Sequence, residues 1–161
     1  MLNIVVIFLA VAIDQLSKLI IISYHDTNIF PKDIISDFLR FTYITNDGIA
    51  FGLNPFGRYS FILLVVSVIA VLFVVKILID SRESSKLVQF SLSLILGGAL
   101  GNLIDRFFTT FNIMDYRGVI DFIDIGIKGY RFYIFNFADF FISLGIILYL
   151  ISFIKSKTIN E

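Results

Sequence analysis

Residues 61–79 read FILLVVSVIAVLFVVKILI, an apolar run interrupted by a single charge, Lys76. A helix rises about 1.5 Å per residue, so roughly 20 apolar residues cross the hydrocarbon core of a bilayer. Three more stretches have a similar length and apolar character, at 2–22, 87–104 and 137–154. The sequence therefore predicts an all-α membrane protein, with four transmembrane helices in a single domain over residues 1–161.

The composition supports a membrane protein and excludes several kinds of functional site. Hydrophobic residues make up 58% of the chain and charged residues only 16%, whereas soluble domains carry about 25% charged residues. Basic and acidic residues balance at 13 each, so nothing indicates a nucleic-acid partner. The absence of cysteine excludes a thiol nucleophile and a Cys-ligated metal. One histidine, His25, argues against a Ser-His-Asp triad, and we expect no metal and no cofactor.

The connections between the four stretches are uneven. A short polar turn follows the second stretch, whereas long connections span about 23–60 and 105–136. With four spans, both long connections lie on one side of the membrane and the termini on the other. Basic residues are densest on the side of the termini, which predicts cytoplasmic termini and outward-facing loops. Asp14 and Lys18 interrupt the first stretch, which favours a retained anchor over a cleaved signal peptide.

The first long connection carries a strand signal. Residues 38–45 read FLRFTYIT and precede the turn-forming residues Asn46, Asp47 and Gly48. We expect a short hairpin here, forming a small β-rich extramembrane cradle from the first long loop. An irregular interfacial loop, anchored by its aromatic side chains, is the alternative.

Polar residues gather at the outward end of the predicted spans. Asp14 and Lys18 are four residues apart and share a helix face, and residues 102, 105 and 106 share another. An ionisable group at the bilayer centre costs at least about 2.5–3.5 kcal/mol and normally faces a bundle interior or a cavity. We therefore expect a functional site at this end. Its candidate residues are Asp14, Lys18, Asn46, Gly48, Asn102, Asp105, Arg106, Asp121, Asn136 and Asp139.

Structural explanations compete for some of these residues. Asp14 and Lys18 could be an ion pair at the interface, and Asn136 with Asp139 has the spacing of a helix-capping pair. Residues 97–101, GGALG, are typical of close helix packing. Their common position at one end of the bundle favours a functional site.

Because the chain has no cysteine and only one histidine, the candidate groups for acid–base chemistry are aspartates. Two adjacent carboxylates do not readily ionise together, so one keeps a proton while the other acts as a base. Such a pair can activate water and protonate an amide. Asp139, at a helix start, is the first candidate, and Asp121, flanked by apolar residues, is the second. Spacing alone leaves Asp124 and Asp105 as alternatives to Asp121.

Five segments in order resemble the motif blocks of the bacterial lipoprotein signal peptidases, the type II signal peptidases. The segments are DQLSK (14–18), NDGIAFG (46–52), GGALGNLIDR (97–106), VIDF (119–122) and FNFAD (135–139). The resemblance implies an intramembrane aspartyl endopeptidase of the bacterial cytoplasmic membrane, with its site facing outward. It would remove the signal peptide from diacylglyceryl-modified prolipoproteins, cleaving before the lipid-modified cysteine.

The resemblance also assigns roles to residues. It gives the catalytic pair as Asp121 and Asp139, and no metal or cofactor is implied. The expected partners are lipid-modified prolipoprotein substrates and membrane lipid, and a monomer is the simplest state. The supporting positions are Asp14, Lys18, Asn46, Gly48, Asn102, Asp105, Arg106 and Asn136.

Three other functions compete with this one. A small transporter would also use intramembrane Asp and Lys, and an internal repeat in the sequence would favour it. A metal-dependent lipid transferase would use an aspartate cluster around Mg²⁺ and would be inhibited by chelators. A non-catalytic assembly subunit would tolerate the loss of either aspartate.

Overall fold

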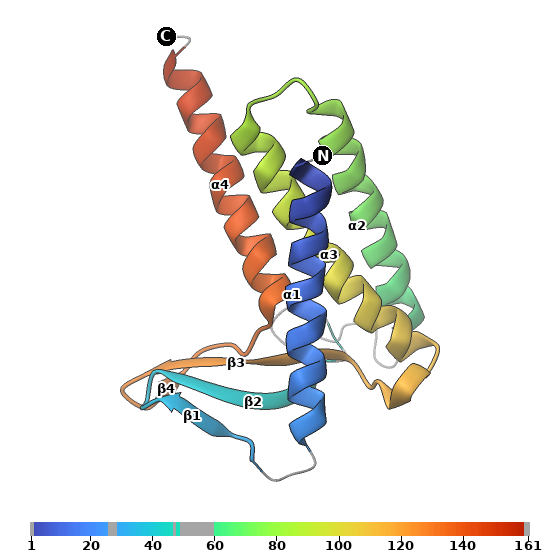
Figure 1. Cartoon of the computed structure of the whole chain (residues 1–161), viewed down its shortest axis with the longest axis vertical. Coiled ribbons are helices and arrows are strands. Elements are labelled where there is room, and N and C mark those ends of the chain that lie inside the picture. The colour runs from blue at the N-terminus through green and yellow to red at the C-terminus, as the bar shows by residue number, and fades with distance from the viewer. Residues whose placement is uncertain (1, 26–28, 47, 49–59, 160–161) are drawn as a thin grey trace.

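Four long helices stand on a small sheet in the computed structural model, which describes residues 2–25, 29–46, 48 and 60–159 (Figure 1). The helices are α1 (Leu2–His25), α2 (Ser60–Asp80), α3 (Lys86–Thr110) and α4 (Phe137–Ile159). Each contains a stretch long and apolar enough to cross a membrane, which confirms that part of the prediction. The two termini lie at the end of the bundle away from the sheet (Figure 1).

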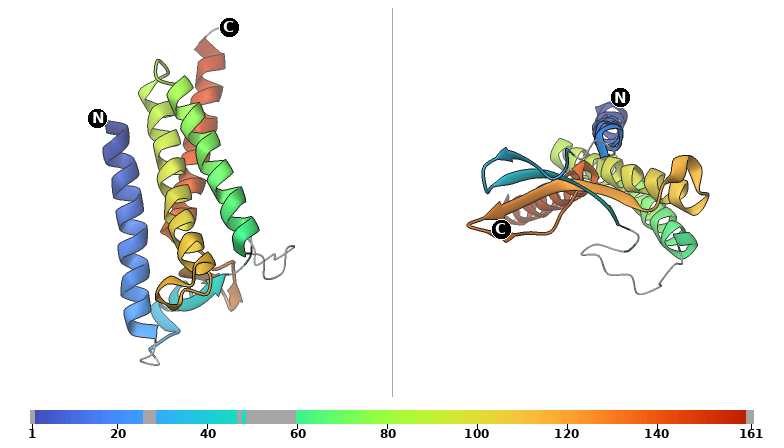
Figure 2. Two further views of the ribbon diagram at one scale, coloured as in Figure 1. Left: turned by 90° about the vertical axis from the view of Figure 1, so that its right-hand side faces the viewer. Right: turned by 90° about the horizontal axis from the view of Figure 1, so that it is seen from below.

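Helix α3 is the central helix and packs against the other three (Figure 2). Half of the most apolar 18-residue stretch of α3 is buried, against 17–22% of the corresponding stretches of the other helices. The outer faces of those helices carry exposed apolar side chains, such as Phe73 and Ile69 of α2. Small residues allow the contact with α4, since a Cβ on Gly98 would overlap the carbonyl oxygen of Ala138. The glycine segment therefore packs helices closely, as its spacing indicates.

Helix α3 continues past residue 104, the predicted end of the third apolar stretch. It runs to Thr110, so Asp105 and Arg106 lie within the helix and not in the outward connection. In this additional segment the rings of Phe107 and Phe111 lie 4.8 Å apart, one helical turn from each other. Helix α1 likewise continues past residue 22, to His25.

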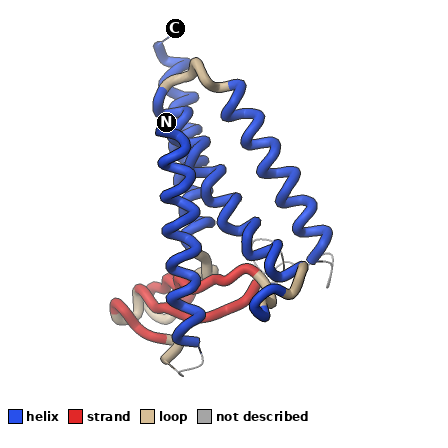
Figure 3. The backbone as a smooth tube through the Cα atoms, turned by 45° about the vertical axis from the view of Figure 1, so that its right-hand side comes forward, coloured by secondary structure: helices blue, strands red, loops and turns tan. Residues whose placement is uncertain are grey.

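The sheet has four antiparallel strands in the order β1-β2-β3-β4, and it lies at one end of the helix bundle (Figure 3). Strands β1 (Lys32–Ile35) and β2 (Leu39–Asn46) come from the first long connection; β3 (Val119–Ile127) and β4 (Tyr130–Arg131) come from the second, after a short 3₁₀ turn, η2 (Ile113–Asp115). The strand predicted at 38–45 is confirmed as β2. The predicted turn at Asp47 and the return segment 49–52 lie outside the described residues. The sheet is wider than the first connection alone predicts, because the β-branched run of β3 pairs with β2.

A β-bulge in β2 determines which side chains face the helices. Phe41 lies opposite Ile123, and Ile44 lies opposite Asp121, so three steps along β2 match two along β3. Each single-residue offset moves all later side chains to the other face of a strand. Asn46 is consequently on the same face as Asp121; in an unbroken pairing from Phe41 it would be on the opposite one.

An apolar core joins the sheet to the helices. It centres on Phe122, which is 1% exposed, together with Ile120, Ile123 and Ile21. The Phe122 ring makes an edge contact with Phe137 at a centroid distance of 5.9 Å. This contact fixes β3 against the start of α4.

Candidate active site

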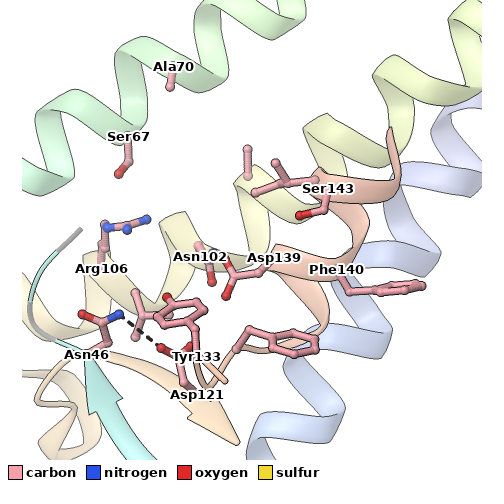
Figure 4. Close-up of a pocket in the computed structure, with 14 residues that line it drawn as sticks. Asn46, Ser67, Ala70, Asn102, Arg106, Asp121, Tyr133, Asp139, Phe140 and Ser143 are labelled. Atoms are coloured by element: carbon pink, nitrogen blue, oxygen red, sulfur yellow. Dashed lines mark hydrogen bonds between the residues drawn. The ribbon is translucent and has the colours of Figure 1, made fainter. Parts of the chain in front are cut away.

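Asp121 of β3 and Asp139 of the first turn of α4 line one cavity of about 640 Å³ (Figure 4). The cavity extends from the sheet toward α2, where Ser67 and Ala70 form its far wall. The two acids are 18 positions apart in the numbering and come from different elements, yet they open into the same space. The remaining lining residues are Asn46, Ala99, Asn102, Arg106, Val119, Tyr133, Phe135, Phe140, Ile142 and Ser143.

Asn46 contacts Asp121 across the sheet. Its Nδ2 donates to Asp121 Oδ2 over 3.2 Å, and the backbone N–H of Gly48 donates to its Oδ1 over 3.0 Å. A backbone N–H can only donate, so the Gly48 contact fixes the orientation of the Asn46 amide. Asp121 therefore receives an N–H donor from this side.

Asn136 connects the two aspartates. Its Nδ2 donates to Asp121 Oδ1 over 2.7 Å, and its backbone N–H donates to Asp139 Oδ2 over 3.3 Å. In return, Asn136 Oδ1 accepts from the backbone N–H of Asp139 over 2.9 Å. This reciprocal pair is a helix cap, so the capping interpretation also holds. One residue thus caps α4 and contacts both carboxylates.

Asn102 and Arg106 approach Asp139 from α3. Asn102 Nδ2 donates to Asp139 Oδ1 over 2.9 Å. The Arg106 guanidinium faces Asp139 and Asp121 and lines the cavity (Figure 4). Among the described residues Arg106 makes no hydrogen bond or ion pair, which leaves its donors open to a group in the cavity.

A fully buried ion cluster lies behind these residues. Lys18 Nζ lies 2.8 Å from Asp14 Oδ2 and 2.8 Å from Asp105 Oδ2, and all three side chains are 0% exposed. Gln15, which was not among the predicted site residues, donates to both carboxylates at 3.1 and 3.0 Å. The i, i+4 pairing of Asp14 with Lys18 is an interior contact, so the interpretation as an interfacial ion pair is wrong.

The pKa of Asp121 is raised to about 7. Burial is the main cause, because removal from water disfavours the charged form, and the negative charge of Asp139 adds to it. The hydrogen bond from Asn46 acts in the opposite direction. A carboxyl with this pKa exchanges its proton near neutral pH.

Asp124 lies away from this cavity. It is three residues from Asp121 on β3, so their side chains project to opposite faces of the strand. Its Oδ1 accepts from Arg131 Nε over 2.9 Å, and Thr42 donates to its Oδ2 over 3.4 Å. The structure therefore separates Asp124 from Asp121, to which spacing alone left it as an alternative.

All ten residues singled out from the sequence lie at the cavity, in the ion cluster behind it, or in direct contact with a lining residue. Sequence reasoning missed Tyr133 and Phe135, which follow β4 and line the cavity. Tyr133 lies beside Asp121 (Figure 4). Ser67 and Ser143 also line it. Aromatic residues are frequent throughout the chain, so only the position of Phe135 next to Asn136 could have indicated a role.

The described residues contain no group of three or more His, Cys, Asp or Glu side chains arranged to hold a metal ion. The clustered carboxylates already contact donors. Asp14 and Asp105 contact Lys18, and Asp121 and Asp139 accept amide N–H groups. The arrangement favours proton transfer between a protonated and an ionised carboxyl.

The chain is similar in sequence and in fold to known bacterial proteins. The chain is 38% identical to a lipoprotein signal peptidase of Clostridium tetani, over 95% of its length and 92% of the relative's. It is 33% identical to a lipoprotein signal peptidase of Staphylococcus aureus, over 97% and 90%. A bacterial membrane enzyme solved by the in meso method at 2.3 Å resolution has the same fold, with a TM-score of 0.81, 31% identity, and coverage of 99% of this chain and 91% of that one.

The sequence profile of the family described as signal peptidase (SPase) II matches residues 6–155. The match extends from the first helix to the last and includes the sheet and every residue that lines the cavity. The chain therefore belongs to the signal peptidase II family.

Proposed function

We propose that this protein is an aspartic endopeptidase that removes the signal peptide from diacylglyceryl-modified prolipoproteins, cleaving before the lipid-modified cysteine. The observation that carries the proposal is the convergence of Asp121 and Asp139 on one cavity, with Asn136 hydrogen-bonded to both. Membership in a family of lipoprotein signal peptidases supports the substrate class.

The cavity has features suited to a lipid-modified peptide. Its polar end holds the carboxylates, the amides and Arg106, and its other end lies between apolar helices. In our proposal the acyl chains pack among the helices, and the peptide bond to be cleaved lies at the polar end. Arg106, which makes no hydrogen bond within the described chain, would bind a backbone carbonyl of the substrate.

The two aspartates would divide the proton transfers. Asp121, with its raised pKa, begins protonated, and Asp139, which accepts N–H groups from Asn102 and Asn136, begins as the carboxylate. Asp139 takes a proton from a water molecule whose oxygen attacks the peptide carbonyl carbon, while Asp121 donates its proton to the carbonyl oxygen. In the second step the C–N bond breaks, Asp139 returns its proton to the departing amine of the cysteine, and Asp121 recovers a proton from the hydroxyl. The pair ends as it began.

The neighbouring amides would hold the two carboxyl groups in position. Asn102 and Asn136 direct N–H donors at Asp139, and Asn46, held by Gly48, directs one at Asp121. These contacts would orient each carboxyl toward the shared space without needing a metal ion.

We further propose the orientation of the protein in the bacterial cytoplasmic membrane. Four candidate membrane-spanning helices fit a multi-pass protein of that membrane. The density of basic residues near the termini supports cytoplasmic termini, and the sheet with its cavity would then face outward. A monomer suffices, because one chain supplies both aspartates.

The proposal is tested with the variants Asp121→Asn and Asp139→Asn, purified in detergent and assayed on a diacylglyceryl-modified precursor peptide. Each should lose at least about 10³-fold in kcat, since neither can complete the proton transfers. Asp124→Asn is the matched control on the same strand and should cleave at close to the wild-type rate. Wild-type cleavage by either dyad variant would overturn the proposal.

A further inference from the structure

Lys18 does not line the cavity, yet it contacts three groups around it. Its ammonium lies 2.8 Å from a carboxylate oxygen of Asp14, 2.8 Å from one of Asp105, and 3.1 Å from Asn102 Oδ1. Burying an ammonium costs several kcal/mol unless its partners are well placed. A single carboxylate would pair the charge, so the second carboxylate needs its own explanation.

Each of these carboxylates also binds the backbone beside one aspartate of the proposed pair. Asp14 Oδ1 accepts from the N–H of Ala138 over 2.9 Å, and Ala138 precedes Asp139. Asp105 Oδ2 accepts from the N–H of Ile120 over 3.2 Å, and Ile120 precedes Asp121. The ammonium of Lys18 thus joins the backbone of β3 to the backbone of α4.

A third contact runs from Lys18 to the Asp139 side chain. An ammonium can only donate, so Asn102 must present its oxygen to Lys18 and its NH₂ group to Asp139. Asn136 Nδ2 donates to the same Asn102 oxygen over 3.2 Å, which supports the same orientation.

We infer that Lys18 is a positioning residue for the proposed reaction. Through Asp14 and Asp105 it fixes the distance between Asp121 and Asp139. Through Asn102 it fixes the orientation of the N–H group that donates to Asp139. The inference rests on the proposed function of Asp121 and Asp139. We call Lys18, Asp14 and Asp105 the Lys18 cluster.

The test removes the ammonium while keeping the net charge and the backbone acceptors. In the double variant Asp14→Asn/Lys18→Met, the amide oxygen introduced at position 14 still accepts from Ala138, and one positive and one negative charge are lost together. We expect kcat to fall about 10²-fold, the loss associated with a misplacement of about 1 Å. KM should not change, because Lys18 does not line the cavity. The exposed pair Lys76–Asp80 of α2 has the same i, i+4 spacing, so Lys76→Met/Asp80→Asn is the matched control and should match wild type.

A pH profile separates positioning from general structural support. Interacting carboxyls titrate as a pair, and their apparent pKa values converge as they move apart. The charged groups facing Asp139 are Lys18 and Asp14 of α1, Arg106 of α3 and Asp121 of β3. The double variant preserves the net charge of the Lys18 cluster, so a change in that charge cannot shift the profile. If the two aspartates move apart, the two limbs of the bell-shaped kcat profile should lie closer together than in wild type. Wild-type kcat, or a reduced kcat with unmoved limbs, would overturn the inference.

Two further comparisons complete the test. If the double variant does not fold, the single variants Asp14→Asn and Asp105→Asn decide: both must lower kcat at constant KM, and wild-type kcat in either one contradicts the inference. Asp121→Asn and Asp139→Asn are assayed alongside. If these cleave normally, the proposed function fails and this inference with it; if they are inactive while the double variant is normal, only the role of Lys18 is rejected.

Discussion

Asn46 and Asp121 form a hydrogen bond of 3.2 Å across β2 and β3 that depends on the bulge between Phe41 and Ile44. The bond stabilises the charged form of Asp121 and so limits how far burial raises its pKa. The amide of Asn46 therefore helps to set the pH range in which Asp121 holds its proton.

Replacing Asn46 should extend activity to higher pH. In the proposed mechanism Asp121 must be protonated, so wild-type kcat should fall as pH rises through about 7. In Asn46→Ala the pKa of Asp121 rises further, and we expect the alkaline limb to move up by about one pH unit, the equivalent of one hydrogen bond to a charged group. The measurement is kcat against pH on a lipid-modified precursor.

Thr42→Val is the control for this shift. It lies on the same strand but contacts Asp124, on the other face of β3. The alkaline limb of its kcat–pH profile should coincide with that of wild type. An Asn46→Ala limb that stays in place or moves to lower pH would show that Asp121 is not the group that controls it.

Removing the Asp121 carboxyl should change how stability depends on pH. Its folded-state pKa, about 7, lies above the ordinary value of 3.8, so between about pH 4 and 7 the unfolded chain gives up this proton while the folded protein keeps it. Stability contributed by the protonated group is therefore present at low pH and is lost as pH rises toward 7. The melting temperature of Asp121→Asn relative to wild type should increase by several degrees from pH 4 to pH 7 in detergent. A constant difference would contradict the raised pKa.

Chelation should leave cleavage unchanged. The carboxylates at the site already accept N–H groups or contact Lys18, which satisfies their oxygens without a metal ion. We expect the same kcat after dialysis against EDTA and after addition of Mg²⁺. Loss of activity with EDTA, restored by Mg²⁺, would favour the metal-dependent transferase considered from the sequence.

Gly101→Ala should destabilise the protein, although alanine usually stabilises a helix by up to about 1 kcal/mol relative to glycine. A Cβ at this position would lie 2.5 Å from Asp14 Oδ2, so this carboxylate, which also contacts Lys18, must shift. We expect a lower melting temperature and a lower kcat. In an Asp14→Ser background the same change should cost less, and equal costs in both backgrounds would show that the contact is not responsible.

Much of the site could be predicted because helical spacing is a local property. The four-residue spacing of Asp14 and Lys18 and the three-residue spacing of Asn136 and Asp139 fix which side chains share a face, and both pairs form in the structure. Four apolar stretches of sufficient length then brought these pairs to the same end of the bundle. The motif resemblance selected Asp121 over Asp124, which alternation along a strand could also have separated.

What could not be predicted depends on contacts between distant segments. No local signal marks the bulge in β2, and alternation continued from Phe41 would put Asn46 on the wrong face. The pairing of β2 with β3 joins two connections that α2 and α3 separate, so the first connection alone predicted only part of the sheet. The extension of α3 to Thr110 passes through Phe and Thr residues, whose weak helix preference made an earlier end equally reasonable.

The Lys18 cluster has a consequence for biosynthesis. It joins the first helix to be synthesised with the start of the last one, and its contacts pass through α3 and β3 on the way. A nascent chain that has not yet synthesised α4 lacks Asp139, and a fragment without α1 retains both aspartates of the proposed pair but lacks Lys18. Under the two proposals above, proteolysis would therefore begin only once α4 has packed beside α1 and α3.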